Sequence, residues 1–302
     1  MGNLIKAEFR KILTTKLWWA LLVPAVLLAT GWAWGVAALV TDIVDDISNS
    51  DIFEQADVTL DQMSWSILAL TRSMNIATIF PMVFGALALS SEISRKTITT
   101  SFLTAPSRAS VLGAKAVTYV LWGLIYGVVV AGAASLGTLI GSKESLLPSA
   151  GDWFLVLVSG IVSCVLWTLL GMGVGALLGS PVGALVLLLV YALLVGPFGE
   201  LILTGVTDGS HLAGWMPNGS ANGLTGSTAS ALLFQQVQDL VVATGGADLI
   251  TEETIDDFER AVRAFAGAPG AYSLLVSGGI FVFWTMIFFV SGLLRNQRRD
   301  IT

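Results

Sequence analysis

Few side chains in this sequence could carry out acid–base, metal or nucleophile chemistry. The chain has one histidine, His211, and one cysteine, Cys164, which lies in an apolar stretch. A single imidazole removes most histidine metal sites and every triad or relay that needs two. No Gly-Lys dipeptide occurs, so the phosphate-binding loop of ATP-hydrolysing enzymes is absent. We therefore expect no catalytic residue, no metal site and no cofactor in this chain, which should not hydrolyse ATP itself.

One segment, residues 42–61, gathers carboxylates that could bind a cation. Their spacing matches no EF-hand loop. We expect a solvated loop or helix extension, with a calcium site as the alternative. The carboxylates are Asp42, Asp45, Asp46, Asp51, Glu54, Asp57 and Asp61.

The elements that position these residues are set by the apolar content. Hydrophobic residues make up 55% of the chain and charged residues only 12%, against about 25% charged in a soluble domain. Lipid must therefore cover much of the surface. Stretches of about 20 residues without Asp, Glu, Lys or Arg predict membrane spans. The predicted fold class is an all-α polytopic membrane protein, a single domain over residues 1–302, with spans at 17–41, 73–91, 116–141, 153–178, 182–203 and 272–294.

Lysine and arginine set the orientation, because basic residues gather on the cytoplasmic side of a membrane protein. With both ends inside, only Arg72, Lys143, Arg260 and Arg263 of the 15 basic residues lie outside. The reverse topology would place those four inside and the rest outside. We therefore expect cytoplasmic N- and C-termini. The cytoplasmic set is Lys6, Arg10, Lys11, Lys16, Arg95, Lys96, Arg108, Lys115, Arg295, Arg298 and Arg299.

Three segments outside the spans have their own patterns. Residues 3–16 alternate apolar and basic residues at helical spacing, which predicts an amphipathic interfacial helix, with a simple basic tail as the alternative. Residues 92–115 form the largest cytoplasmic connection. The outer region 205–271 predicts two short surface or re-entrant helices, one over 229–242 and one that begins at Thr251 as N-cap.

Charge inside the predicted spans is scarce. No acid or base lies deep in any of them, and Glu200, near the outer end of the fifth, comes closest. Ion-coupled transporters need a titratable or coordinating group within the membrane, so this pattern disfavours a secondary transporter. Glycines four residues apart, such as Gly31 and Gly35 or Gly171 and Gly175, predict close helix packing, either within one subunit or at a dimer seam.

At this point the layout resembles the ABC-2 type permease family, the six-span membrane subunits of bacterial ABC exporters. The resemblance covers essentially the whole chain and rests on the order of its parts: an amphipathic N-terminal helix, six spans and a long region between spans five and six. A stretch in that region, Trp215-Met216-Pro217-Asn218-Gly219-Ser220-Ala221, is similar to one often seen there. The run after span two is similar as well, although many members have glycine before the threonine. That run is Glu92-Ile93-Ser94-Arg95-Lys96-Thr97, then Phe102-Leu103-Thr104-Ala105-Pro106-Ser107-Arg108, then Lys115.

The resemblance implies that two permease subunits, identical or closely related, each recruit a cytoplasmic ABC ATPase that binds ATP and Mg²⁺. The segment around 92–106 would then be the coupling helix that docks into the ATPase. The alternative is a surface helix held by anionic lipid. The coupling candidates are Glu92, Arg95, Lys96, Thr97, Ile98, Phe102, Leu103 and Arg108.

The resemblance also implies that spans two and five face the substrate path. Their residues are apolar and aromatic with a few polar groups, which suits a hydrophobic or amphipathic compound such as a drug, antibiotic or lipid. The alternative is that they face lipid or only pack. The path candidates are Asn75, Thr78, Phe80, Met82, Phe84, Tyr191, Phe198 and Glu200.

The predicted function is therefore the permease subunit of an ATP-driven exporter, multidrug export being one example, in the plasma membrane of a bacterium. Membrane lipids are expected to contact it, and no nucleic acid is expected as a partner. The alternative is a non-transporting scaffold or sensor component of a signalling complex.

Overall fold

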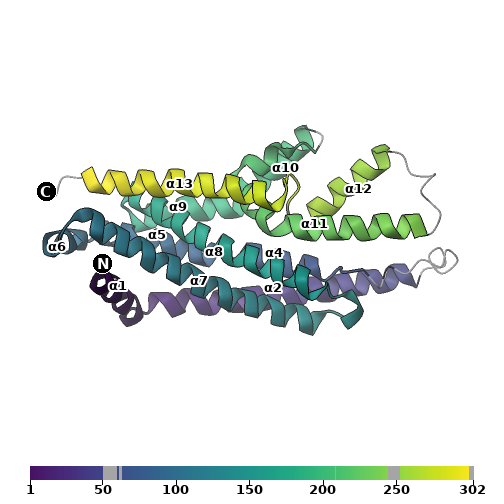
Figure 1. Ribbon diagram of the computed structural model, residues 1–302, viewed down its shortest axis with the longest axis horizontal. Helices are drawn as coiled ribbons and strands as arrows, with labels where there is room; N and C mark the ends of the chain where they lie inside the picture. Colours follow the sequence, from purple (N-terminus) through teal and green to yellow (C-terminus); the bar gives the residue numbers. More distant parts are fainter. Residues whose placement is uncertain (50–59, 61–62, 208, 244–251, 299–302) are drawn as a thin grey trace.

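The computed structural model describes residues 1–49, 60, 63–207, 209–243 and 252–298 (Figure 1). In these residues the chain is almost entirely helical and contains no strand. Six of the helical stretches described are long and apolar enough to cross a membrane: Leu17–Ser48, Ile67–Ser94, Arg108–Gly141, Ala150–Leu178, Pro181–Val206 and Leu274–Gln297. The prediction of an all-α chain with six helices long and apolar enough to span a membrane is confirmed for the described residues, and this is the architecture of a multi-pass membrane protein.

The described helices follow one another along the chain in this order. Helix α1 (Gly2–Thr14) leads into α2 (Leu17–Ser48), the first span. The second span is divided into α4 (Ile67–Ala77) and α5 (Ile79–Ser94), and the short α6 (Thr97–Thr104) joins it to α7 (Arg108–Gly141). The later elements are η2 (Glu144–Leu146), α8 (Ala150–Leu178), α9 (Pro181–Val190), the π-helical turn η3 (Tyr191–Val195), α10 (Gly196–Val206), η4 (His211–Trp215), α11 (Pro217–Ala243), α12 (Glu252–Phe265) and α13 (Leu274–Arg298).

Serine caps fix the start of three of the α-helices. The side chains of Ser107, Ser149 and Ser180 each accept a hydrogen bond from a backbone N–H in the first turn of the helix that follows. Such a cap satisfies one of the N–H groups that a helix start leaves without an intrahelical partner. Gly179 ends α8 in the left-handed conformation (φ 67°) that favours glycine, and Pro181 then begins α9. This turn separates the predicted spans 153–178 and 182–203.

The spanning helices extend beyond the charge-free stretches that predicted them. Helix α4 begins at Ile67, so Arg72 lies inside the second span rather than before it. The first turns of α4 are buried in the bundle. They fall outside the predicted span because a charge-free stretch cannot extend past Arg72. Helix α2 continues through Asp42, Asp45 and Asp46 to Ser48, as a helix extension. The other carboxylates of the acidic segment, Asp51, Glu54, Asp57 and Asp61, lie outside the described residues.

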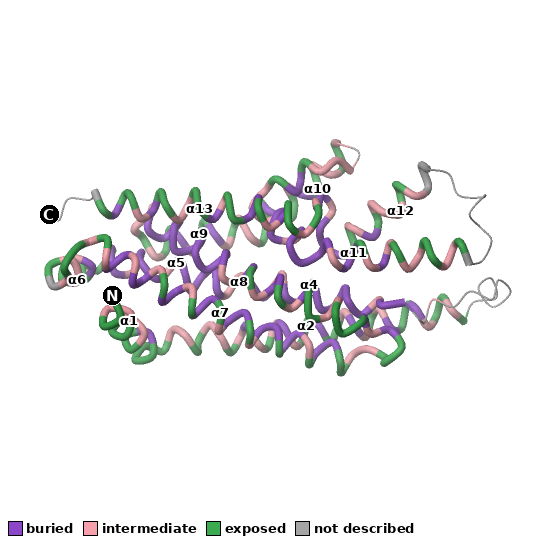
Figure 2. The backbone as a smooth tube through the Cα atoms, in the orientation of Figure 1, coloured by how far each residue is buried: buried purple, intermediate pink, exposed green. Residues whose placement is uncertain are grey.

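The centre of the bundle is formed by α5 and α8, which pack along each other, with α7 and α13 also against α8 (Figure 2). Glycine makes this approach possible. A Cβ atom on Gly171 would lie 2.1 Å from the carbonyl oxygen of Met82, and one on Gly175 would lie 2.1 Å from the carbonyl oxygen of Ala86. These glycines therefore serve packing within the chain. A Cβ atom on Gly31 or Gly35 in α2 would meet nothing within 4 Å, so the dimer interpretation stays a prediction for them.

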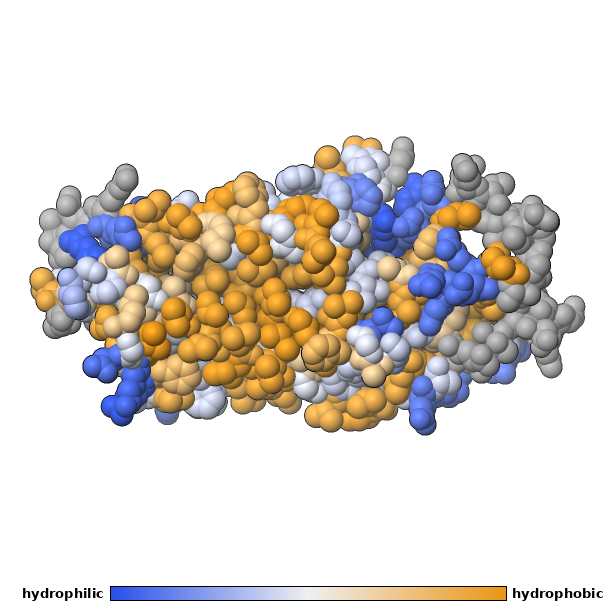
Figure 3. All heavy atoms as spheres, in the orientation of Figure 1, coloured by the Kyte–Doolittle hydropathy of each residue, from blue (hydrophilic) through white to orange (hydrophobic). Residues whose placement is uncertain are grey.

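The two ends of the bundle differ in composition. Helices α1 and α6 and the end of α13 lie together at one end, which we call the terminal end, and α12 lies at the opposite end (Figure 1). Between them an apolar band covers the middle of the face seen in Figure 3, with hydrophilic residues gathered toward both ends. Helix α1 and the last turns of α13 therefore lie on the same side of the bundle.

The region between spans five and six differs most from expectation. Helix α11 begins at Pro217, not at Ala229, and packs against α4, α8 and α13. Its first half is rich in glycine, serine and asparagine, a composition that predicts a loop in water. Here the small residues let the helix enter between its neighbours, and Ser220 and Thr225 are fully buried. The second expected helix is α12, while its predicted N-cap, Thr251, lies outside the described residues.

Candidate functional site

Two spans are interrupted at the same depth of the bundle. The second span breaks at Thr78, between α4 and α5, where the Thr78 hydroxyl donates to the backbone carbonyl of Asn75 over 2.6 Å. Pro81, three residues on, has no N–H to donate to the preceding turn. The fifth span breaks at η3, where the backbone widens to a π-helix before Gly196 and Pro197. Interruptions of this kind occur frequently at functional sites.

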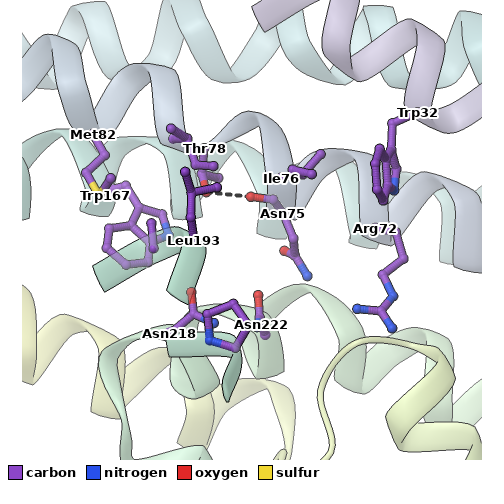
Figure 4. A pocket seen from close by; sticks show the side chains of 13 residues that line it. Trp32, Arg72, Asn75, Ile76, Thr78, Met82, Trp167, Leu193, Asn218 and Asn222 are labelled. Carbon is purple, nitrogen blue, oxygen red and sulfur yellow. Dashed lines mark hydrogen bonds between the residues drawn. The ribbon is translucent and has the colours of Figure 1, made fainter. Parts of the chain in front are cut away.

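A cavity of about 260 Å³ lies between the two interruptions (Figure 4). Its wall combines polar groups with the rings of Trp32 and Trp167. Residues from α2, the second span, α8, the fifth span and α11 line it, so the pocket lies within the spanning part of the bundle. The lining residues are Trp32, Arg72, Asn75, Ile76, Thr78, Ile79, Met82, Trp167, Ala192, Leu193, Pro197, Asn218 and Asn222.

Arg72 supplies a positive charge to this pocket. Its Nε and Nη2 groups donate to the backbone carbonyls of Phe265 and Ala264, at 3.0 and 2.9 Å. These two carbonyls belong to the last turn of α12, so Arg72 satisfies acceptors that the helix end leaves open. Gly267 (φ 81°) passes so close that a Cβ there would lie 2.4 Å from Nη1. Among the described residues, no acceptor pairs with the Nη1 group.

Asn75 lies one helical turn after Arg72 and is only half satisfied. Its Oδ1 accepts a short hydrogen bond from the hydroxyl of Thr225 on α11. This bond orients the amide, so that Nδ2 is the group left over. The Nδ2 group is buried and has no hydrogen-bond partner among the described residues. A buried donor without an acceptor is costly, and this one lies in the wall of a cavity.

Glu200 stands behind the pocket and orients two further amides. The side chain, 4% exposed, accepts hydrogen bonds from Asn218 Nδ2 at 2.6 Å and Asn222 Nδ2 at 3.2 Å. Because the nitrogens point to Glu200, the amide oxygens are left for the pocket, as Figure 4 shows. Tyr191, in the π-helical turn, accepts a hydrogen bond from the Asn218 backbone N–H at 3.1 Å. The fifth span and α11 are thereby joined at the pocket wall.

The path candidates from the sequence fall into three places. Asn75, Thr78 and Met82 line the pocket, and Tyr191 and Glu200 position its wall. Phe84 is buried among Tyr119, Trp122 and Tyr126. Phe80 packs against the core. Phe198 lies exposed on the surface.

Sequence reasoning misses Arg72, Asn218 and Asn222 as pocket residues. The charge of Arg72 ends the predicted span, which places this residue at the outer surface. The two asparagines, four residues apart, would signal one helix face only if residues 217–228 were known to be helical. Both charged residues lie near the ends of their spans: Arg72 is in the second turn of the Ile67–Ser94 stretch, and Glu200 is six residues before the end of the Pro181–Val206 stretch, where it is buried.

A second group of charges lies at the terminal end. Lys115 of α7 is 0% exposed and donates to Glu8 of α1 at 2.7 Å and to Glu92 of α5 at 2.6 Å. Lys11 of α1 also forms an ion pair with Glu92. We call Glu8, Lys11, Glu92 and Lys115 the ion cluster. It ties the amphipathic helix α1 to the ends of two spans.

The coupling candidates surround α6, next to the ion cluster. Arg95, Lys96, Thr97 and Leu103 are exposed, with Leu103 at 76%. Lys96 makes the turn into α6 in the left-handed conformation (φ 57°), which is uncommon for a residue with a side chain. The other candidates face the protein. Glu92 is in the ion cluster, Ile98 is buried, Phe102 packs partly against the core, and Arg108 lies over the Phe102 ring and donates to the carbonyl of Gln297.

Comparison with known proteins adds no family. No protein-family model matches the chain, and no characterised protein matches it at a significant level. The pocket and the terminal end therefore carry the functional argument.

Proposed function

We propose that this chain is the membrane subunit of an ATP-driven exporter of the ABC-2 permease type. It would move a hydrophobic or amphipathic compound across a bacterial plasma membrane, powered by a separate ATPase. The observation that carries the proposal is the polar pocket between two interrupted spans. Polar groups inside a membrane are costly and usually mark a substrate or ion pathway.

The proposed orientation places the terminal end in the cytoplasm. Basic residues of α1, of the turn before α6 and of the end of α13 gather there, and the rule that cytoplasmic segments are rich in lysine and arginine then applies. In this orientation α12 and the end of α2 with its aspartates are outside. The pocket lies on the path between the two sides.

The exposed surface of α6 would receive the ATPase, which would bind ATP and Mg²⁺ itself. Arg95 and Lys96 offer charge for ionic contacts, and Leu103 offers an apolar side chain that water otherwise surrounds. Glu92 and Ile98 face inward and support the base of this helix. Their proposed role is to hold α6, not to contact the partner.

The ion cluster would carry movement of α6 into the spans. Helix α6 connects α5 to α7, and Lys115 pairs with carboxylates from α5 and α1. A displacement of α6 therefore acts on the second span, whose interruption forms one wall of the pocket. Buried ion pairs of this kind resist separation, because an unpaired buried charge is strongly unfavourable.

A second copy of the chain, or a close paralogue, would complete the pathway. Gly31 and Gly35 lie exposed in α2, beside Trp32 at the rim of the pocket. Small residues on a membrane helix allow another helix to approach closely. A second copy against this face would cover the opening of the pocket.

The buried carboxylate of Glu200 favours a second candidate, an ion-coupled transporter. A buried acid in a membrane protein can carry a proton or bind a cation. Glu200 is, however, screened from the pocket by the amides of Asn218 and Asn222, and its oxygens accept their hydrogen bonds. We therefore rank this candidate second.

Affinity purification from native membranes in mild detergent tests the proposal. Mass spectrometry of the purified complex should find an ABC ATPase in stoichiometric amount. A scaffold of a signalling complex would bring other proteins instead, and an ion-coupled transporter would bring no ATPase. Either of these results would contradict the proposed function.

A further inference from the structure

The pocket presents unused hydrogen-bonding groups of a defined kind. Arg72 keeps its Nη1 group without a partner among the described residues, and Asn75 keeps a buried Nδ2 group without one. Opposite them, Asn218 and Asn222 turn their amide oxygens to the cavity because Glu200 holds their nitrogens. Figure 4 shows these four side chains directed toward one another across the space. The two free donors lie on one helix, one turn apart.

From this arrangement we infer that the pocket binds the anionic headgroup of an amphiphile, with Arg72 and Asn75 donating to the anionic oxygens. This inference rests on the proposed function and deepens it, because it names the class of compound that the site takes. The oxygens of Asn218 and Asn222 accept from a hydroxyl or amine of the same headgroup. The aliphatic part leaves the pocket toward the membrane.

An anion fits better than a cation because of where the charges lie. Arg72 is the only charged residue among those that line the described pocket. Glu200 is not part of the lining, and its two oxygens already accept hydrogen bonds from the asparagines. Opposite charges attract far more strongly in a partly enclosed, low-dielectric site than in water. A cationic headgroup would instead meet the guanidinium at short range.

An amphiphile fits better than a small free anion because of where the pocket opens. Two of its lining residues, Trp32 and Leu193, are 44% and 54% exposed, and both lie in membrane-spanning stretches. The opening therefore faces apolar surroundings, which would be filled by a hydrocarbon chain. A free phosphate would have to give up its water to reach the same place, with no apolar area buried in return.

Ligand-dependent stabilisation of the purified protein tests this inference. Cys164 is the sole thiol and is buried, so a thiol-reactive fluorophore reports thermal unfolding. The probes are decyl phosphate, decyl glucoside and decyltrimethylammonium at equal mole fraction in dodecyl maltoside micelles, together with inorganic phosphate. A ligand that binds the native state raises the midpoint of unfolding. Decyl phosphate should raise it most, and inorganic phosphate should raise it little.

Variants assign the effect to the pocket. Arg72→Gln should weaken the affinity for decyl phosphate by about ten-fold or more, because a charge-assisted hydrogen bond is lost. Since this change also removes the bonds to α12, Asn75→Asp provides an independent variant. It keeps an acceptor for Thr225, replaces the free donor by an acceptor, and should weaken the affinity by a similar factor. Lys143→Gln, an exposed charge outside the pocket, should leave it unchanged.

Four results would overturn the inference. Two concern the decyl compounds: equal shifts of the unfolding midpoint with all three, or the largest shift with decyltrimethylammonium. The third is a shift with inorganic phosphate as large as that with decyl phosphate. The fourth is an Asn75→Asp protein that keeps full affinity for decyl phosphate. None of these depends on an ATPase. If decyl phosphate does not bind but affinity purification still recovers an ABC ATPase, only this inference is overturned. If decyl phosphate binds but no ATPase is recovered, only the proposed function is overturned.

Discussion

Lys115 is the buried charge that joins three helices at the terminal end. It is fully buried, and its ammonium group is compensated by Glu8 and Glu92, which come from two other helices. A charge in this position is tolerated only while its partners remain in place. The ion cluster therefore makes the contact of α1 with the bundle depend on charge as well as on apolar packing.

Glu92→Gln should destabilise the protein by about 1–3 kcal/mol, since it removes one of the two carboxylates that compensate the buried Lys115. Unfolding by denaturant, followed through labelling of Cys164, measures the change. Lys11→Gln is the matched control. Lys11 pairs with the same carboxylate but its side chain is 48% exposed, so its loss should cost less than about 1 kcal/mol. Equal effects of the two substitutions would show that the cluster is not a buried pair centred on Lys115.

At the scale of the elements, the bundle depends on backbone contact between α5 and α8. Gly175→Ala would place a Cβ 2.1 Å from the carbonyl oxygen of Ala86, so the two helices would have to separate. We expect a loss of about 1–3 kcal/mol, as for other overpacked cores. Gly132→Ala, in α7 with nothing within 4 Å, should instead be neutral or stabilising, by up to about 1 kcal/mol. The same Cys164 labelling compares the two, and a Gly175→Ala protein as stable as Gly132→Ala would refute the close packing.

Helix α6 is the element that the proposed function assigns to the ATPase. Reversing the charges of the turn that leads into it, with Arg95→Glu and Lys96→Glu together, should uncouple ATP hydrolysis from transport while the protein still inserts in the membrane. Both side chains are exposed, so stability should change little. Transport at the normal rate in the double variant would show that the ATPase docks elsewhere. Lys6→Glu, exposed on the neighbouring α1, serves as the control for charge alone.

The elements also show what the sequence can predict. Stretches without any charged residue, such as residues 153–178 of α8, follow directly from the sequence. The sequence predicts too short a second span, because the charge of Arg72 is compensated by the end of α12, more than 190 residues later in the chain. It predicts a loop for the first half of α11, because small polar residues signal turns in water and close packing in a membrane bundle. The pocket lies where these two elements meet, so the sequence predicts its residues only in part.

For the whole molecule, the orientation is an expectation from lysine and arginine that labelling can check. The experiment uses two single-cysteine variants in a Cys164→Ala background. Leu103→Cys lies in α6 and Lys143→Cys follows α7, and both positions are exposed, at opposite ends of the bundle. A membrane-impermeant maleimide added to intact spheroplasts should label Lys143→Cys at once. It should label Leu103→Cys only after the membrane is permeabilised. The reverse pattern would place the terminal end outside.

The proposed pathway joins three parts of the molecule: α6 at the terminal end, the interrupted second span, and the pocket. Each part is positioned by contacts within the chain, whereas the energy source and the second copy would come from other chains. We therefore predict that the isolated chain binds its amphiphile but moves nothing. Movement should appear only in the complex with the ATPase.

The most direct measurement of the central claim is transport by the purified complex in proteoliposomes. A fluorescent anionic amphiphile should be moved across the bilayer when ATP and Mg²⁺ are present on the side of the ATPase. The movement should be lost in the Asn75→Asp complex, even though that complex still hydrolyses ATP. Movement that continues without ATP, or that follows an imposed proton gradient instead, would contradict the proposed function.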